Sequence, residues 1–163
     1  MKVEFKFFLE KFPAAKLPII LSDEAHHDFA KENDPLPPPI VQDFIVHYEP
    51  SEPDEFTEYI ACFQIPTPKK DFKAIVYWKA GLLNYDYVVA TYEGKTGVMI
   101  DKKAIAGTKV VGNAVKRIVA TIFEDFSIVT AEGVEEKNVD YIADSSQTHR
   151  YEILENGRIE QDY

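Results

Sequence analysis

The segment from Phe72 to Ile105 limits the fold more than any other region of the chain. It contains two runs rich in β-branched and aromatic residues, at 74–78 and 85–92. The sequence EGKTG follows them and supplies two glycines before the chain continues at 98–105. Runs of this kind favour strands, and a glycine-containing break between them favours a hairpin. The segment therefore predicts an antiparallel meander.

The N-terminal third of the chain predicts two short helices. Ser22–Asn33 begins with a residue that can cap free N–H groups and ends just before a proline, so it predicts a surface helix anchored by Phe29. Four prolines follow at positions 35–39, and Pro38 or Pro39 can occupy the first turn of a helix that reaches Ile45.

Two other N-terminal segments predict extended structure. Residues 3–8 alternate apolar and charged side chains, which is typical of a half-buried strand. Residues 17–21 are apolar but contain Pro18, which favours an edge strand.

The second half of the chain predicts further strands. Tyr59–Ile65 is typical of a buried strand, and 141–142 of a short one before a polar loop at 143–149. Residues 115–129 fit either a helical face or β-branched strands; flanking turns favour two strands broken at 124–125. The C-terminal residues 150–163 predict a hairpin with a type I′ turn at Asn156-Gly157.

Together these segments predict an α+β fold. We expect a mostly antiparallel β-meander sheet of about six to eight strands with one or two short N-terminal helices. The whole chain, 1–163, is expected to form a single globular domain. In it, the helix- and proline-rich segment 1–58 packs on the β-rich segment 59–163.

Composition argues against several classes of protein. The 163 residues are 45% hydrophobic, which suffices for a core without metal or disulfide support. The single cysteine, Cys62, cannot form an intramolecular disulfide. No secretory signal and no apolar run of membrane-spanning length is visible. A soluble, cytoplasmic protein is expected.

The formal net charge of −10 bears on the choice of partner. Phosphate backbones and anionic lipids repel such a protein, so we expect no nucleic acid and no membrane as partner. A basic protein partner is compatible with this charge. Solubility alone would explain the charge equally well.

Aromatic residues in the meander are the candidate ligand-binding residues. Side chains of this type can present apolar faces with polar tips to a sugar or planar ligand. Packing across neighbouring strands is the alternative explanation. The candidates are Tyr77, Trp78, Tyr85 and Tyr87.

Metal and catalytic sites have weaker support. The densest group of metal-binding residue types is Asp23, Glu24, His26, His27 and Asp28, but no HExxH sequence occurs and an exposed polar helix face explains the group. We therefore predict no metal and no cofactor.

The chain also lacks a GxSxG elbow, a P-loop and a dinucleotide-binding fingerprint. Cys62 lies in an apolar run that would bury it and keep its thiol inert. Pairing of Cys62 with His47 or His149 cannot be inferred from the sequence.

The leading hypothesis is a non-enzymatic protein-interaction or binding module with an acidic surface. The alternative is a small-ligand-binding protein or an unrecognised enzyme with a pocket beside residues 74–92. A subunit of a homo-oligomer formed through an exposed edge strand is a third possibility.

Overall fold

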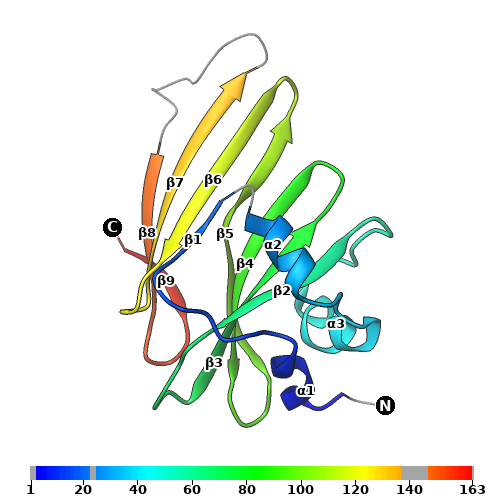
Figure 1. Ribbon diagram of the computed structural model, residues 1–163, viewed down its shortest axis with the longest axis vertical. Coiled ribbons are helices and arrows are strands. Elements are labelled where there is room, and N and C mark those ends of the chain that lie inside the picture. Colours follow the sequence, from blue (N-terminus) through cyan, green and yellow to red (C-terminus); the bar gives the residue numbers. More distant parts are fainter. Residues whose placement is uncertain (1–2, 23–24, 137–146, 163) are drawn as a thin grey trace.

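The computed structural model describes residues 3–22, 25–136 and 147–162 (Figure 1). Its main element is a nine-stranded sheet in which β2 to β9 follow one another in chain order and every pair is antiparallel. The strands are β1 (Ile19–Leu21), β2 (Glu58–Ile65), β3 (Phe72–Ala80), β4 (Asn84–Glu93), β5 (Met99–Val111), β6 (Ala114–Ile122), β7 (Ser127–Glu136), β8 (Gln147–Ile153) and β9 (Ile159–Asp162). The α+β meander predicted from the sequence is confirmed, with one strand more than the expected range.

The first strand departs from the chain order. β5 pairs with β6 as far as Ile118, and β1 then takes its place along β6, with Leu21 opposite Ala120. The residues before β1 are fixed to β2, the strand at one edge of the sheet, because Ala15 N donates to Gln64 O at 2.9 Å. The N-terminal segment therefore runs from the edge of β2 across to β6.

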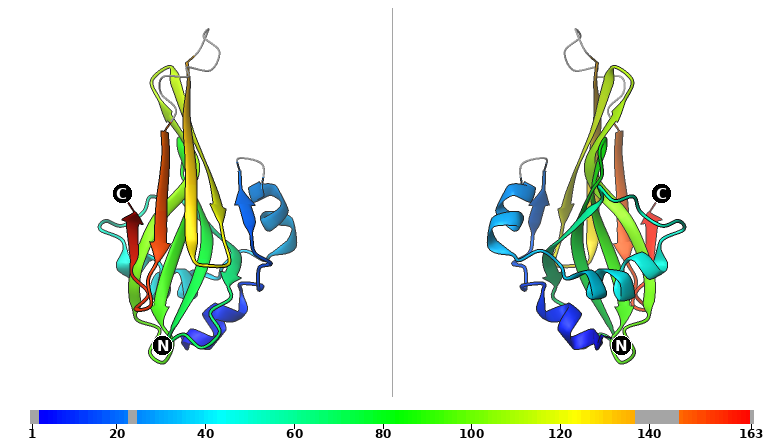
Figure 2. Two further views of the ribbon diagram at one scale, coloured as in Figure 1. Left: turned by 90° about the vertical axis from the view of Figure 1, so that its left-hand side faces the viewer. Right: turned by 90° about the vertical axis from the view of Figure 1, so that its right-hand side faces the viewer.

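Alternating side chains on the central strands divide the core into two layers. On β3, Val76 and Trp78 point to one side, whereas Ile75 and Tyr77 point to the other. The layer that contains Trp78 also includes buried residues of β1, β6, β7 and β8, so the sheet curves around it. Figure 2 shows α2 and β1 on one flank of the molecule and β9 on the opposite flank.

Short helices cover the Tyr77 side of the sheet. They are α1 (Phe5–Glu10), α3 (Pro38–Phe44) and the 3₁₀-helix η1 (Val46–Tyr48). They place Phe8, Ile40 and Phe44 against Tyr77 and Tyr92 in one buried cluster, which we call the helix-covered face. The remaining helix, α2 (Ala25–Glu32), packs Phe29 on the other layer, 5.7 Å from the Phe63 ring.

Most of the predicted elements are confirmed. α2 and α3 lie in the two segments predicted to be helical, and β1 is a short strand at residues 19–21. The ambiguous segment 115–129 forms β6 and the start of β7, as predicted, with the turn at 123–126. Turn residues on both sides outweighed the helical spacing of the apolar residues.

The prediction of a strand at residues 3–8 is wrong, because Phe5–Glu10 forms α1. The alternating pattern also places Phe5, Phe8 and Phe12 on one helical face, at spacings of three and four. The Phe8 ring lies 4.7 Å from Phe44 and 5.0 Å from Phe12. Packing of these rings against the sheet overrides the local pattern.

The C-terminal hairpin is confirmed, but its turn type is not I′. Gly157 N donates to Leu154 O at 2.9 Å, which puts Glu155 and Asn156 at the two central positions of the turn. A type I′ turn needs positive φ at both, and in this loop positive φ is found at Gly157, at 87°. The predicted strand at 141–142 and the start of the polar loop lie outside the described residues.

Among the residues that the structure describes, no helix has the length and apolar character required to cross a membrane.

Candidate functional site

A groove with a volume of about 510 Å³ lies between α3, the loop after η1 and the start of β2. Its walls are mostly apolar. They include three prolines and four other apolar residues: Pro35, Pro38, Pro53, Leu36, Val41, Val46 and Ile60. Its volume lies in the usual range for ligand pockets.

The first wall of the groove is fixed to the edge of β2. Asn33 Nδ2 donates to Ala61 O at 2.6 Å and to Cys62 O at 3.1 Å, and Pro35 forms an antiparallel bridge with Ile60. Pro38 then starts α3, since a proline in the first turn loses no helical hydrogen bond. The prolines therefore lie alongside β2 and stiffen this wall.

The second wall is the loop at residues 49–57. Glu49 is largely buried, and its two carboxylate oxygens lie 3.2 Å from Lys79 Nζ and 3.2 Å from Lys102 Nζ. Further along, Asp54 Oδ1 accepts hydrogen bonds from Phe56 N at 2.9 Å and from Thr57 Oγ1 at 3.0 Å. The loop is thus fixed at one end by ion pairs to two strands and shaped at the other by a turn.

The hydroxyl of Tyr59 distinguishes the wall formed by β2. The side chain is 9% exposed, and its hydroxyl is the one buried side-chain oxygen or nitrogen of the described residues without a hydrogen-bond partner. Burial, and then the negative charges of Glu49 and Asp54, raise the pKa of Tyr59 to about 12. The group therefore remains a neutral hydroxyl in a negative electrostatic environment.

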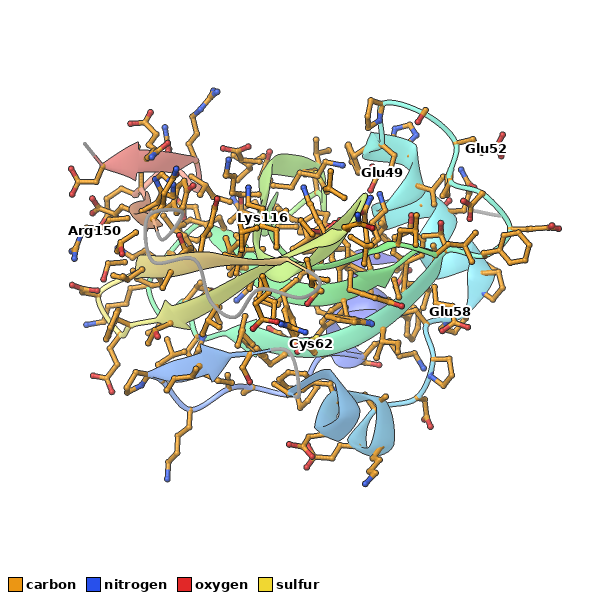
Figure 3. All side chains as sticks on the ribbon, turned by 90° about the horizontal axis from the view of Figure 1, so that it is seen from above. Glu49, Glu52, Glu58, Cys62, Lys116 and Arg150 are labelled. Atoms are coloured by element: carbon orange, nitrogen blue, oxygen red, sulfur yellow. The ribbon has the colours of Figure 1, made fainter. Side chains whose placement is uncertain are left out.

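The groove is built from the most acidic region of the chain. Residues 32–58 contain eight Asp and Glu and no Lys or Arg, so they account for most of the net charge of −10. Six of these side chains are exposed and form no ion pair with another described residue: Glu32, Asp34, Glu52, Asp54, Glu55 and Glu58. Figure 3 shows Glu49, Glu52 and Glu58 at one end of the molecule, with Arg150 at the opposite end.

A second carboxylate, Asp86 of β4, lies close to the Glu49 ion pairs. Its strand neighbour on β3 is Lys79. Burial raises the pKa of Asp86, although the positive charges of Lys109 and Lys79 act in the opposite direction. Near Tyr59, the helix-covered face thus contains both partly buried charged groups and the groove.

Volume alone does not single out this groove. A cavity of about 480 Å³ lies between α1 and the β4–β5 turn, and one of about 540 Å³ is lined by charged residues such as Lys73 and Glu93. Among the described residues, only the groove at Tyr59 combines apolar walls with a buried hydroxyl that lacks a partner, and the segment that builds it carries the six exposed acids. We therefore take it as the candidate site.

The four aromatic residues predicted to bind a ligand do not line this groove. Tyr77 belongs to the helix-covered face, whereas Trp78 and Tyr87 are buried in the other layer. Tyr85 is half-buried and stacks on Trp78 with a centroid distance of 5.7 Å and an angle of 7°. The structure brings three of the four together, and their role in binding stays a prediction.

The other predicted sites can be placed only to a limited extent. Cys62 is buried and unpaired, and burial raises the pKa of its thiol. Of the residues considered for metal binding, Asp23, Glu24 and the side chains of His26 and His27 lie outside the described residues. The described residues contain no group of three or more side chains that could hold a metal.

Tyr59 was not among the residues predicted from the sequence. The surroundings of its hydroxyl are formed by α3, the loop at 49–57 and β2, and only the folded chain brings these three segments together. One signal was present, because the long acidic stretch without a single Lys or Arg coincides with the proline-rich segment.

Comparisons with known proteins gave no relative: no family model, no curated protein and no solved structure matches the chain.

Proposed function

We propose that this protein is a non-enzymatic, cytoplasmic protein-interaction module that binds a basic segment of a partner protein in the groove beside Tyr59. The observation that supports the proposal is the coincidence of an apolar groove with six exposed, unpaired acids on the segment that builds it. Apolar walls provide area to bury, and a rim of one charge selects a partner of the opposite charge.

The ion pairs of Glu49 support this assignment. They neutralise Glu49, whereas Glu52, Glu55 and Glu58 are exposed and form no ion pair with a described residue. Exposed charges of this kind accelerate association with a basic partner and lose their effect as salt screens them. Binding should therefore weaken steadily as the salt concentration rises.

Affinity capture from the native cell extract tests the proposal. The test variant carries Glu52→Gln, Glu55→Gln and Glu58→Gln, and the matched control carries Glu10→Gln, Glu124→Gln and Glu160→Gln at exposed positions elsewhere. We expect wild type and control to retain the same basic protein at low salt, and the test variant to lose most of it. Equal capture by all three proteins, or capture of no protein, would contradict the proposal.

Small-ligand binding beside residues 74–92 is the second candidate, because Tyr85 is half-buried and stacks on the ring of Trp78. A planar ligand that inserted there would displace Tyr85 and change the emission of Trp78, the single tryptophan of the chain. Titration of planar and sugar ligands against this emission tests the idea. An unchanged spectrum with every ligand would count against it.

A further inference from the structure

The hydroxyl of Tyr59 calls for a partner that the described residues do not provide. More than nine-tenths of the side chain is buried, and the oxygen makes no hydrogen bond to a described residue. Buried polar groups in folded proteins are almost always paired, because an unpaired one keeps the full cost of its desolvation. Tyr59 lines an open groove, although its oxygen is itself shielded from solvent. An occupant of the groove that moves the covering side chains aside would supply the missing partner.

We propose that the groove receives an arginine side chain of the partner, whose guanidinium donates a hydrogen bond to Tyr59 Oη while its stem packs against Val41 and Val46. This inference rests on the proposed function and specifies the partner's side chain.

The charges around Tyr59 favour a cationic donor. Asp54 lies close enough for its negative charge to act on the Tyr59 hydroxyl. Glu58 also lines the groove and is exposed. Glu49 is already paired with two lysines, whereas neither Asp54 nor Glu58 forms an ion pair with a described residue. Asp54 Oδ1 accepts two hydrogen bonds within the loop, so its charge is still available to a cation. A positive group in the groove would be attracted by both carboxylates.

The apolar walls favour arginine over lysine. A guanidinium is planar, more weakly hydrated than an ammonium, and carries five N–H donors in a fixed arrangement. It therefore loses less hydration in a groove lined by prolines and valines, and one N–H can reach Tyr59 while others face the rim. The long aliphatic stem packs against apolar walls while the charged head keeps its polar contacts.

Three blocked pentapeptides, Leu-Gly-X-Gly-Leu with arginine, lysine or citrulline at X, test the inference. Binding is followed through the NMR signals of the methyl groups of Val41, Val46 and Ile60, which line the groove. We expect the arginine peptide to shift these signals at concentrations up to about 10 mM. Citrulline keeps the shape but lacks the charge, so that peptide should bind at least about tenfold more weakly.

Tyr59→Phe is the decisive variant, with Tyr85→Phe on the other layer as control. We expect Tyr59→Phe to lose about tenfold in affinity for the arginine peptide while its melting temperature stays at or above that of wild type. Tyr85→Phe should bind as wild type does. The retained melting temperature separates a lost contact from a lost fold.

Several results would overturn the inference. They are unchanged affinity in Tyr59→Phe, equal binding of the citrulline peptide, and no shift of the three methyl signals. If Tyr59→Phe binds normally while the three-glutamate variant still loses the basic partner, the proposed function stands and the arginine assignment fails. If both variants keep the partner, the proposed function fails as well.

Discussion

The two ends of the helix-covered face are built in opposite ways. At one end the centroid of the Phe8 ring lies 4.7 Å from that of Phe44 and 5.3 Å from that of Tyr92. Tyr92 Oη also donates a hydrogen bond to Phe44 O at 2.7 Å. At the other end the centroids of the Tyr59 and Tyr77 rings are 6.1 Å apart. Tyr59 lines the groove formed by prolines and a loop, and its hydroxyl has no partner among the described residues.

The difference separates stability from binding. At the end near Phe8, which we call the closed end, each ring fills space and the Tyr92 hydroxyl makes a hydrogen bond. Every contact there therefore stabilises the fold. The end near Tyr59, which we call the open end, retains features that cost stability. They are a buried hydroxyl without a partner among the described residues and partly buried carboxylates. Proteins keep such features where a ligand uses them.

Phe8→Ala should have the largest effect, because it removes the central ring of the closed end. We expect the free energy of unfolding to fall by about 3–5 kcal/mol. Chemical denaturation measures it. The control is Phe7→Ala in the same helix, where the side chain is 46% exposed and a change within about 0.5 kcal/mol is expected. Equal losses in the two variants would mean that α1 does not depend on its buried face.

Tyr92→Phe should come next. It removes the donor of the 2.7 Å bond and leaves Phe44 O buried without that partner. We expect a loss of about 1–2 kcal/mol in the free energy of unfolding. The outcome is measured by the same denaturation experiment, and a neutral result would mean that this hydroxyl does not matter for stability.

Tyr59→Phe should have the opposite sign. The same substitution at the open end removes a buried hydroxyl that has no partner, so the free energy of unfolding should rise by about 1 kcal/mol. Destabilisation similar to that of Tyr92→Phe would show that the Tyr59 hydroxyl is satisfied in solution, and the contrast between the two ends would disappear.

Asp86 gives the smallest and most specific test. It lies on β4, on the same side of the strand as Tyr92 but at the open end. Its pKa is raised above the ordinary value of 3.8, so the folded chain holds this proton more tightly than the unfolded chain. The contribution to stability is therefore fully present below pH 3.8 and is lost as the pH rises through the raised pKa.

Asp86→Asn should abolish this dependence. The free energy of unfolding of wild type minus that of the variant should fall as the pH rises above 3.8 and become constant once the carboxylate is ionised. Denaturation of both proteins across a pH series measures the difference. A difference that does not change with pH would contradict the assignment.

Local sequence was enough to predict most of the strands. The β4–β5 hairpin and the C-terminal hairpin follow from glycines between β-branched runs, and α3 follows from Pro38 in a first helical turn. Each of these signals lies within a few residues. The C-terminal turn was assigned the wrong type because asparagine and glycine also fit a turn in which only Gly157 has positive φ.

The failures share a dependence on distant regions of the chain. α1 forms because its rings pack against Phe44 and Tyr92, and neither residue is near it in the sequence. The candidate site needs α3, the loop at 49–57 and β2 at once. Sequence reasoning predicted the acidic surface and located the prolines at 35–39, but it could not show that the prolines and the acidic loop meet beside Tyr59.

The pairing of β1 with β6 also has a consequence for the order of events during synthesis. β1 is made before β2 to β5, yet its hydrogen-bonding partner β6 is made only after them. Contacts between such distant segments carry a large loop-closure cost and slow folding. Leu21 would therefore enter the core late, and until then the nascent sheet would have one side of its core exposed to aggregation.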